Sequence, residues 1–240
     1  MVEYEVLFSG ASCEQMNDDS LSAAIFTGDS LENNVAQLSE IVASLASDGF
    51  GEGKVMSPER MEGRLLREGN LIIALDQDSV PVGFQMQTVF SEGEEDFLYY
   101  SRVVRKDQQG KGIGGKLLRV ATSLYKPTVV AARSQNPVEI SSFLREMESL
   151  NVGGVYPFNF PYDSNPRAQE SLRVLVSKLG YLGKTDLETG LCRGAYSEGR
   201  LGDYEIRTDH PRIQKVEQDL VRFGLDRQGG DAIFYLALVR

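Results

Sequence analysis

The segment QQGKGIGGKLL, residues 108–118, contains closely spaced glycines of the kind that hold phosphate groups. Three overlapping patterns can be read in it: G-x-G-x-x-G from Gly110, G-x-x-x-x-G-K from Gly110, and Q-x-x-G-x-G from Gln109. Because glycine has no Cβ, such a turn can bring backbone N–H groups close to a phosphate or pyrophosphate. The patterns imply different ligands, which the surrounding residues distinguish.

The first pattern binds dinucleotides where its first glycine lies at the tip of a buried strand. Here the mostly polar segment VRKDQQ, residues 104–109, precedes Gly110. No acidic residue stands about 20 positions later to bind a ribose; Gln135 is close to that place. A dinucleotide site is therefore disfavoured.

The second pattern is most of a nucleotide-binding P-loop, which needs Ser or Thr after its lysine because that hydroxyl holds magnesium. Leu117 stands there instead, on the apolar face of a predicted helix. No apolar strand that ends in an aspartate clearly offers the second magnesium partner. A nucleotide hydrolase is thus the weaker alternative.

The third pattern holds the pyrophosphate of an acyl-CoA, and its surroundings fit. A strand, a polar turn and glycines that open a helix form a set of backbone N–H groups at a positive helix end. Lys111, Lys116 and Arg119 can add positive charge around the same anion. The sequence therefore favours an acyl-CoA loop.

Composition limits the classes of partner. The chain has 240 residues, a net charge of −10 and 41% hydrophobic residues, which is typical of a soluble globular protein. The negative charge disfavours nucleic acid and anionic membranes as partners. Cys13 and Cys192 have no metal spacing and His210 is the single histidine, so no metal site is expected. Glu3 and Glu5 do not suit a secretory signal, and we expect a cytoplasmic protein.

Hydrophobic patterns predict the elements around the loop. We expect a first strand over 2–8, helices within 13–68, and antiparallel strands over 70–77, 80–90 and 96–104. After the loop we expect a helix over 112–125, a buried strand over 127–133, and a helix from Pro137 with Asn136 as N-cap. Residues 151–166 read as an ordered loop. The later elements are two helices and a last strand, over residues 167–181, 211–223 and 231–239.

The motif VVRKDQQGKGIGGKLL and the order of elements around it resemble the GNAT superfamily of N-acetyltransferases, whose loop reads Q/R-x-x-G-x-G/A. The resemblance implies an α/β fold of the α+β type: a central mixed, mostly antiparallel sheet with splayed central strands and helices on both faces. It covers about residues 70–186 of one predicted domain, 1–240. An insertion at about 147–165 and a C-terminal extension, 187–240, complete that domain.

The resemblance also implies the cofactor, acetyl-CoA as acyl donor, and its site. The backbone of the strand over 96–104 would pair with the pantetheine arm, the loop amides would hold the pyrophosphate, and Asn136 would lie beside the arm. The implied cofactor-binding residues are Val103, Val104, Gln109, Gly110, Lys111, Gly112, Ile113, Gly114, Gly115, Lys116 and Asn136.

The catalytic residues of one well-known subset of the family are missing. Ala131 stands where that subset has a glutamate, and Phe143 where it has a tyrosine; an alternative alignment places Val176 there. The remaining candidates lie on the strand over 96–104. We expect Tyr100 as the general acid and Asp96 as the general base for attack by an amine on the thioester.

The acceptor implied is a primary amine of a small molecule or peptide. Arg133 to Asn136 would lie at the mouth of its site, and aromatic residues of the 151–166 loop could wall it: Tyr156, Phe158, Phe160 and Tyr162. The acidic run EGEED, residues 92–96, would draw a cationic amine. The same loop could instead close a small core of its own.

A second class of function stays open. Without the glutamate and tyrosine, the chain could be a catalytically silent sensor or interaction module that binds acetyl-CoA. Turnover with a panel of amines would exclude it. A homodimer contact could lie in residues 187–240, where no residue pattern names a chemistry.

Overall fold

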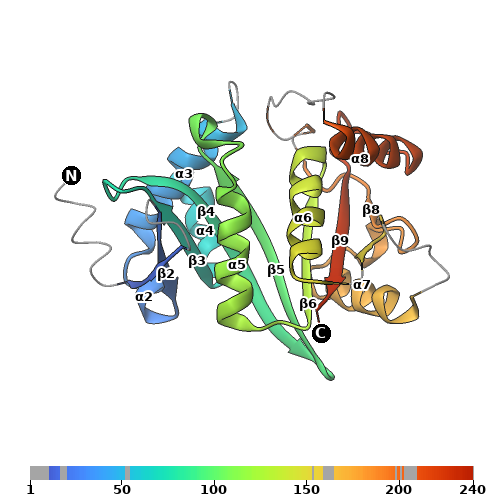
Figure 1. Ribbon diagram of the computed structural model, residues 1–240, viewed down its shortest axis with the longest axis horizontal. Coiled ribbons are helices and arrows are strands. Elements are labelled where there is room, and N and C mark those ends of the chain that lie inside the picture. The colour runs from blue at the N-terminus through green and yellow to red at the C-terminus, as the bar shows by residue number, and fades with distance from the viewer. Residues whose placement is uncertain are drawn as a thin grey trace. The chain divides into compact units, whose positions relative to one another are not determined.

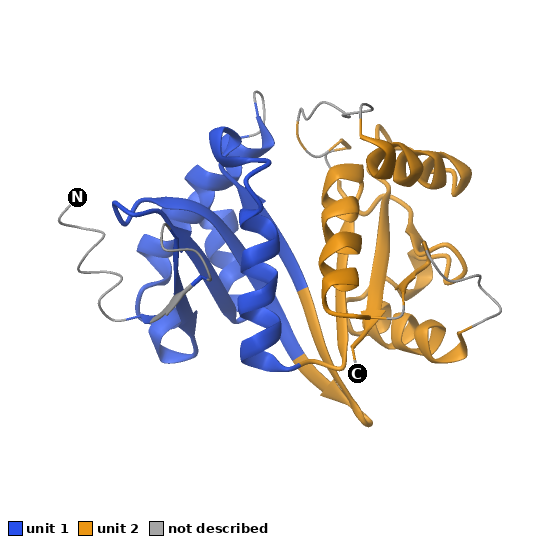
Figure 2. Cartoon of the chain, in the orientation of Figure 1, with its two compact units in different colours: residues 1–89, 100–126 blue, residues 90–99, 127–240 orange. Residues whose placement is uncertain are grey.

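The structure is a computed structural model that describes residues 11–16, 21–51, 55–152, 154–158, 165–197, 199–200, 202 and 210–239, without the side chains of 13–15. The strand expected over 2–8 lies outside these residues. The chain divides into two compact units (Figure 2). Unit 1 is Met1–Val89 with Tyr100–Lys126, and unit 2 is Phe90–Tyr99 with Pro127–Arg240. The single domain over 1–240 stays a prediction.

Unit 1 contains an antiparallel sheet in the order β1-β2-β3-β4-β5 (Figure 1). Its strands are β1 Ser12–Gln15, β2 Ser22–Thr27, β3 Asn70–Leu75, β4 Pro81–Glu92 and β5 Glu95–Val104, the last two of which continue into unit 2. β3, β4 and β5 are the three strands that the sequence predicts. The helical prediction for 13–68 is wrong over β1 and β2. In β2 four successive residues are buried, so no two-residue alternation marks it as a strand.

The helices of unit 1 are α2 Asp29–Glu32, α3 Val35–Phe50, α4 Pro58–Glu68 and α5 Ile113–Tyr125. α4 begins as its sequence indicates: Ser57 Oγ accepts the N–H of Arg60 at 3.3 Å, and Pro58 follows the cap. α3 approaches Val103 of β5, while α5 contacts the side chain of Arg102. Successive strand residues point to opposite faces, so these helices cover opposite faces of the sheet (Figure 1).

Unit 2 is built around β9, Ala232–Leu238, which pairs antiparallel with β6, β7 and β8. Its strands are β6 Val129–Ser134, β7 Val155–Tyr156 and β8 Leu191–Cys192; its helices are α6 Pro137–Ser149, α7 Pro166–Lys178 and α8 Pro211–Arg222. The 3-10 turn η3 is Leu182–Lys184. Neither β7 nor β8 was expected, because a two-residue strand carries no pattern of its own.

The three longer helices of unit 2 begin alike, each with a polar cap followed by proline at the first position. Asn136, Asn165 and His210 accept backbone N–H groups at the starts of α6, α7 and α8. The Asn136 cap is confirmed, and His210 is exposed at a helix start. The predicted α/β fold with a mostly antiparallel sheet is confirmed. None of the described helices combines the length and apolar character that a membrane span requires.

Candidate functional site

The glycine loop lies between β5 and α5 in unit 1. After the 3-10 turn η1, Lys106–Gln108, the chain passes Gly110 at φ 82° and Gly112 at φ 79°. Only glycine adopts this left-handed backbone without cost. A Cβ on either residue would meet nothing within 4 Å, so backbone conformation and not packing requires the two glycines. The space over the turn is open to a ligand.

Gly112 is also the N-cap of α5. The N–H of Lys116 donates to the carbonyl of Gly112 at 3.1 Å. The N–H groups of Ile113, Gly114 and Gly115 precede this bond and have no acceptor inside the helix. They form the positive end of a 13-residue helix, where an anion is stabilised.

Gln109 ties the loop to two other elements. Its side-chain amide donates to the carbonyl of Gly49 at 3.2 Å and to that of Val104 at 3.1 Å. The neighbouring turn is fixed in the same way, because Asp48 accepts the N–H of Lys106 at 2.7 Å. The end of α3 therefore sets the position of the loop. Asp48 and Gly49 are about 60 positions away in the sequence, and no local pattern indicates their role.

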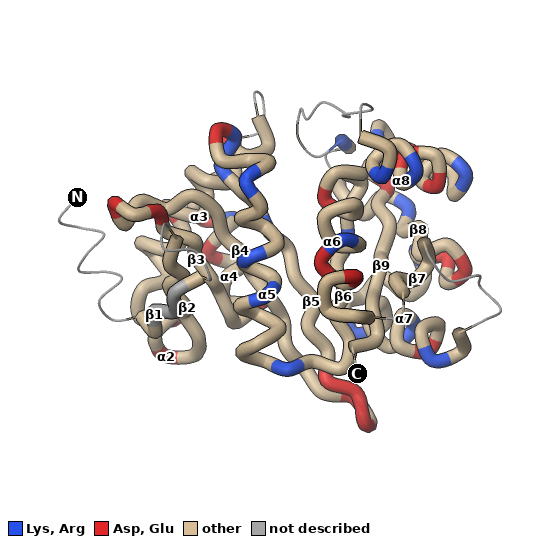
Figure 3. The backbone as a smooth tube through the Cα atoms, in the orientation of Figure 1, with Lys and Arg blue, Asp and Glu red and all other residues tan. Residues whose placement is uncertain are grey.

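Arg102 connects the loop with the proposed acid. Its guanidinium donates to the carbonyl of Gly114 and lies 5.3 Å from the ring centre of Tyr100. A Cβ on Gly114 would stand 3.2 Å from Arg102 Nε, so this glycine allows a close approach. Together with Lys111 and Lys116, Arg102 makes the start of α5 basic. Figure 3 shows basic positions on and near α5.

The two predicted catalytic residues occupy different surroundings on β5. Tyr100 is buried, with 1% of its surface exposed. Asp96 is exposed, and its carboxylate accepts the hydroxyl of Ser91 at 2.6 Å beside the β4–β5 turn. Four residues of extended strand span about 13 Å. The two side chains therefore do not meet through a direct contact.

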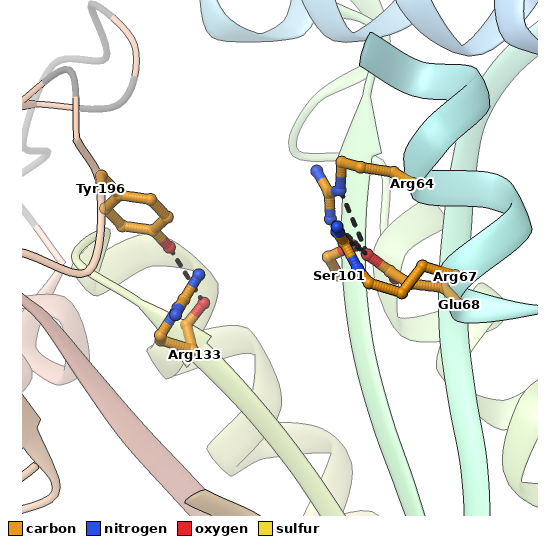
Figure 4. Close-up of polar contacts among 6 residues, drawn as sticks. All are labelled: Arg64, Arg67, Glu68, Ser101, Arg133 and Tyr196. Atoms are coloured by element: carbon orange, nitrogen blue, oxygen red, sulfur yellow. Dashed lines mark hydrogen bonds and ion pairs between the residues drawn. The ribbon is translucent and has the colours of Figure 1, made fainter. Parts of the chain in front are cut away.

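A polar cluster that the sequence did not predict lies against β5 on the α4 side (Figure 4). Glu68, at the end of α4, is only 7% exposed. Its carboxylate accepts Nε and Nη2 of Arg64 at 3.1 and 2.8 Å, and Ser101 Oγ lies 3.5 Å from its other oxygen. Arg64 also donates to Ser101 at 2.8 Å. The cluster places a carboxylate of α4 beside a hydroxyl of β5, the strand that carries Tyr100.

In unit 2 the residues at the expected family positions are part of the core. Ala131, Phe143 and Val176 are each 0% exposed. Asn136 accepts the N–H of Val138 at 2.9 Å as the cap of α6, and its own N–H donates to Ser134 Oγ at 3.0 Å. The hydrogen bond to Val138 uses the side-chain oxygen of Asn136 within its own helix.

Part of the aromatic loop over residues 151–166 belongs to the hydrophobic core. Tyr156 is 0% exposed and donates its hydroxyl to the carbonyls of Leu187 and Glu188, so it does not wall an open acceptor site, and the prediction is wrong for this residue. Phe158 packs 5.9 Å from Phe223 and 6.3 Å from Tyr235, between ring centres. Phe160 and Tyr162 lie outside the described residues.

The acidic run over 92–96 is partly neutralised. Glu95 accepts Arg167 Nε at 2.9 Å and the hydroxyl of Ser171 at 2.7 Å. Figure 3 shows the remaining acidic positions at the β4–β5 turn. Glu95 thus has a structural partner on α7, which leaves less negative charge to draw a cationic amine.

Arg133, on β6, lies among three aromatic rings of unit 2. Its guanidinium carbon is 4.5 Å from the ring centre of Tyr181, 5.0 Å from that of Tyr196 and 5.4 Å from that of Phe234. Tyr196 also donates its hydroxyl to the Arg133 carbonyl at 3.3 Å, as Figure 4 shows. We call this group of rings the Arg133 cage.

The Arg133 side chain remains charged in the cage. Burial by itself lowers the pKa of a guanidinium, but the phenol oxygens of Tyr99, Tyr196 and Tyr181 raise it more, so the pKa lies above its usual value. Its Nε and Nη1 are buried and have no hydrogen-bond partner. Sequence reasoning placed Arg133 near an acceptor but gave no sign of the rings around it.

The free cysteine and the possible metal ligands do not form a second reactive site among the described residues. Cys192 is a free thiol, 0% exposed, and burial raises its pKa. Within the part of the chain that the structure describes, no group of three metal-binding side chains forms.

Solved structures offer a coarse likeness in fold. No family model matches the chain, and a comparison with curated proteins finds no match. A ribosomal-protein-S5-alanine acetyltransferase from Vibrio fischeri is similar over 62% of this chain and 88% of its own, at 9% identity and a TM-score of 0.41. A phosphinothricin acetyltransferase from Sinorhizobium meliloti, in complex with acetyl-CoA, is similar over 55% and 77%, at 18% identity and a TM-score of 0.38. These TM-scores are too low to support a functional argument, so the function is argued from the residues of this chain.

Proposed function

We propose that the chain is an acetyl-CoA-dependent N-acetyltransferase that moves an acetyl group to a primary amine of a small molecule or peptide. The observation that supports this most is the loop between β5 and α5. Two left-handed glycines, Gly110 and Gly112, lead into the free N–H groups of a helix, and Gln109 ties the turn to β5 and α3. This arrangement suits a pyrophosphate.

The cofactor would extend from that loop along β5. The proposed contacts are the amides of Gln109 to Gly115 for the pyrophosphate, with Lys111 and Lys116 for its charge. The backbone of Val103 and Val104 would pair with the pantetheine arm; the Val104 carbonyl already accepts Gln109, which leaves its second lone pair. Asn136 stays a predicted cofactor contact.

The chemistry would be direct attack of the neutral amine on the thioester carbonyl. A backbone N–H of β5 would donate to the oxyanion, and the CoA thiolate would take a proton as it leaves. We propose Tyr100 as that acid, held beside the loop by Arg102. For the base two carboxylates compete: Asp96 on β5, and Glu68, which lies against Ser101. A water molecule would carry the proton to either one.

The silent acetyl-CoA sensor is the second candidate, because Ala131 and Phe143 replace the acid and base of one family subset. Both functions require the loop, and only turnover separates them. Release of free CoA in the presence of an amine panel supports the enzyme. Tight binding without turnover across the panel supports the sensor.

The test is calorimetric titration of the full chain with acetyl-CoA, with ATP plus magnesium, and with NAD. We expect micromolar binding of acetyl-CoA alone and its loss in Gly112→Glu. The matched control is Gly183→Glu, because Gly183 lies in an exposed turn with open space around it. Binding of ATP or NAD without acetyl-CoA would sink the proposal.

A further inference from the structure

Arg133 differs from three other arginines of unit 2 in its partners. Arg167, Arg193 and Arg227 contact the carboxylates of Glu95, Asp231 and Glu217 at 2.9, 2.5 and 2.5 Å, respectively. Arg133 has no ion pair within the described part of the chain, and its Nε and Nη1 lack hydrogen-bond partners. It is a charged group held among rings without a counter-charge.

The rings satisfy only part of what the guanidinium needs. Aromatic faces stabilise a cation through their quadrupole, but they do not accept strong hydrogen bonds from the planar N–H groups. A buried N–H without a partner is costly, and a buried charge more so. A carboxylate is the group that the planar guanidinium matches best, through two parallel hydrogen bonds. The Arg133 cage therefore has the chemistry of a carboxylate site whose anion none of the described residues supplies.

The place of Arg133 in unit 2 points to the acceptor. It is the fifth residue of β6, and Ser134, Gln135 and the Asn136 cap follow it. Tyr99 of β5, the strand on which the proposed chemistry occurs, is among the groups that act on its charge. The residue as a whole is only partly buried, although its Nε and Nη1 atoms are covered.

We propose that Arg133 binds a carboxylate of the acceptor, so that the substrate is a small amine with a carboxylate, such as an amino acid. The inference rests on the proposed acetyltransferase function. The rings of Tyr181, Tyr196 and Phe234 surround the guanidinium and limit its movement.

The experiment compares matched acceptors: amino acids and their carboxamides, which share the amine and lack the negative charge. Acetyl transfer is followed by CoA release with wild type, Arg133→Met and Arg222→Met. Arg222 is the control, because it also lies over a ring, at 5.1 Å from Phe223, but is exposed and paired with Asp219. We expect Arg133→Met to raise KM for the amino acids about 10- to 100-fold, the effect of losing charge-assisted hydrogen bonds. KM for the carboxamides stays unchanged.

Two outcomes overturn the inference: equal changes of KM for both acceptor series in Arg133→Met, or a carboxamide preference in wild type. If Arg133→Met does not fold, calorimetry of wild type with N-acetyl amino acids and N-acetyl carboxamides decides, since these product analogues need no turnover. Carboxylate-selective binding supports the site, and equal affinity overturns it. Acetyl-CoA titration runs in parallel, so that the two proposals can fail separately. If acetyl groups are transferred to carboxamides and Arg133→Met has no effect, the proposed function stands and the inference fails. If the protein binds carboxylates but not acetyl-CoA, the proposed function fails.

Discussion

Gly49 of α3 lies directly against Val103 of β5. A Cβ placed on Gly49 would stand 2.3 Å from Val103 Cγ1 and 2.9 Å from the carbonyl of Val104. No real Cβ tolerates such distances, so the helix reaches the strand only because this residue is glycine. The same contact brings the Gly49 carbonyl within 3.2 Å of the Gln109 amide. The packing of α3 on β5 and the position of the glycine loop therefore depend on the same residue, Gly49.

Gly49→Ala should therefore destabilise the protein. An extra carbon in a packed site costs about 1–3 kcal/mol, and the loop must move with the helix. We expect a lower urea midpoint and weaker binding of acetyl-CoA. Gly63→Ala is the matched control: Gly63 lies in α4 with no atom within 4 Å, and alanine there should stabilise the helix by about 1 kcal/mol. Equal midpoints for the two variants would contradict the packing argument.

Gln109→Ala should weaken acetyl-CoA binding more than it weakens folding. The change removes two hydrogen bonds to the carbonyls of Gly49 and Val104 at the exposed start of the loop. We expect the Kd for acetyl-CoA to rise about tenfold, because each such bond contributes roughly 1 kcal/mol. Gln108→Ala is the control: among the described residues its amide hydrogen-bonds with Lys111 and Asp107 on the surface, and the Kd should stay within about twofold.

The base can be assigned by comparing Glu68→Gln with Asp96→Asn. We expect Glu68→Gln to lower kcat by about 10²- to 10⁴-fold, the usual contribution of a general base. Asp96→Asn should leave kcat nearly unchanged, because Asp96 is exposed at the β4–β5 turn. The reverse pattern would assign the base to Asp96, and thermal melting of both variants separates catalysis from folding.

Asp231 should make the stability of unit 2 dependent on pH. Its buried carboxylate accepts the N–H groups of Gly194 and Asp226 at 3.0 and 3.1 Å and contacts Arg193 at 2.5 Å. Burial raises the pKa of this carboxyl, but those partners outweigh it, so the pKa lies below its usual value. The stabilisation is present above about pH 4 and is lost as the pH falls through the lowered pKa.

The measurement is the urea midpoint of wild type and Asp231→Asn between pH 7 and pH 3. Wild type should be the more stable at pH 7, with the gap closing below about pH 4. A gap that stays constant with pH would show that Asp231 contributes through packing alone.

Local sequence patterns predicted the structural features that depend on a few neighbouring residues, such as helix starts. Ser57 with Pro58, and Asn136 with Pro137, mark helix starts because a cap bonds an N–H two or three residues away. The left-handed glycines of the loop are similarly local. β3, β4, β5, α5 and β6 followed from hydrophobic patterns long enough to have a period.

Only the tertiary structure decided the rest, because those features join residues distant in the chain. Arg64 and Ser101 are 37 positions apart, Gln109 and Gly49 are 60, and the rings around Arg133 come from three further segments. β1, β2, β7 and β8 are strands through their pairing, since each is short or buried too evenly to show alternation. Sequence spacing located the glycine loop that we propose for the anion. The fold selected the side chains around the proposed site, because close approach in space has no local signature.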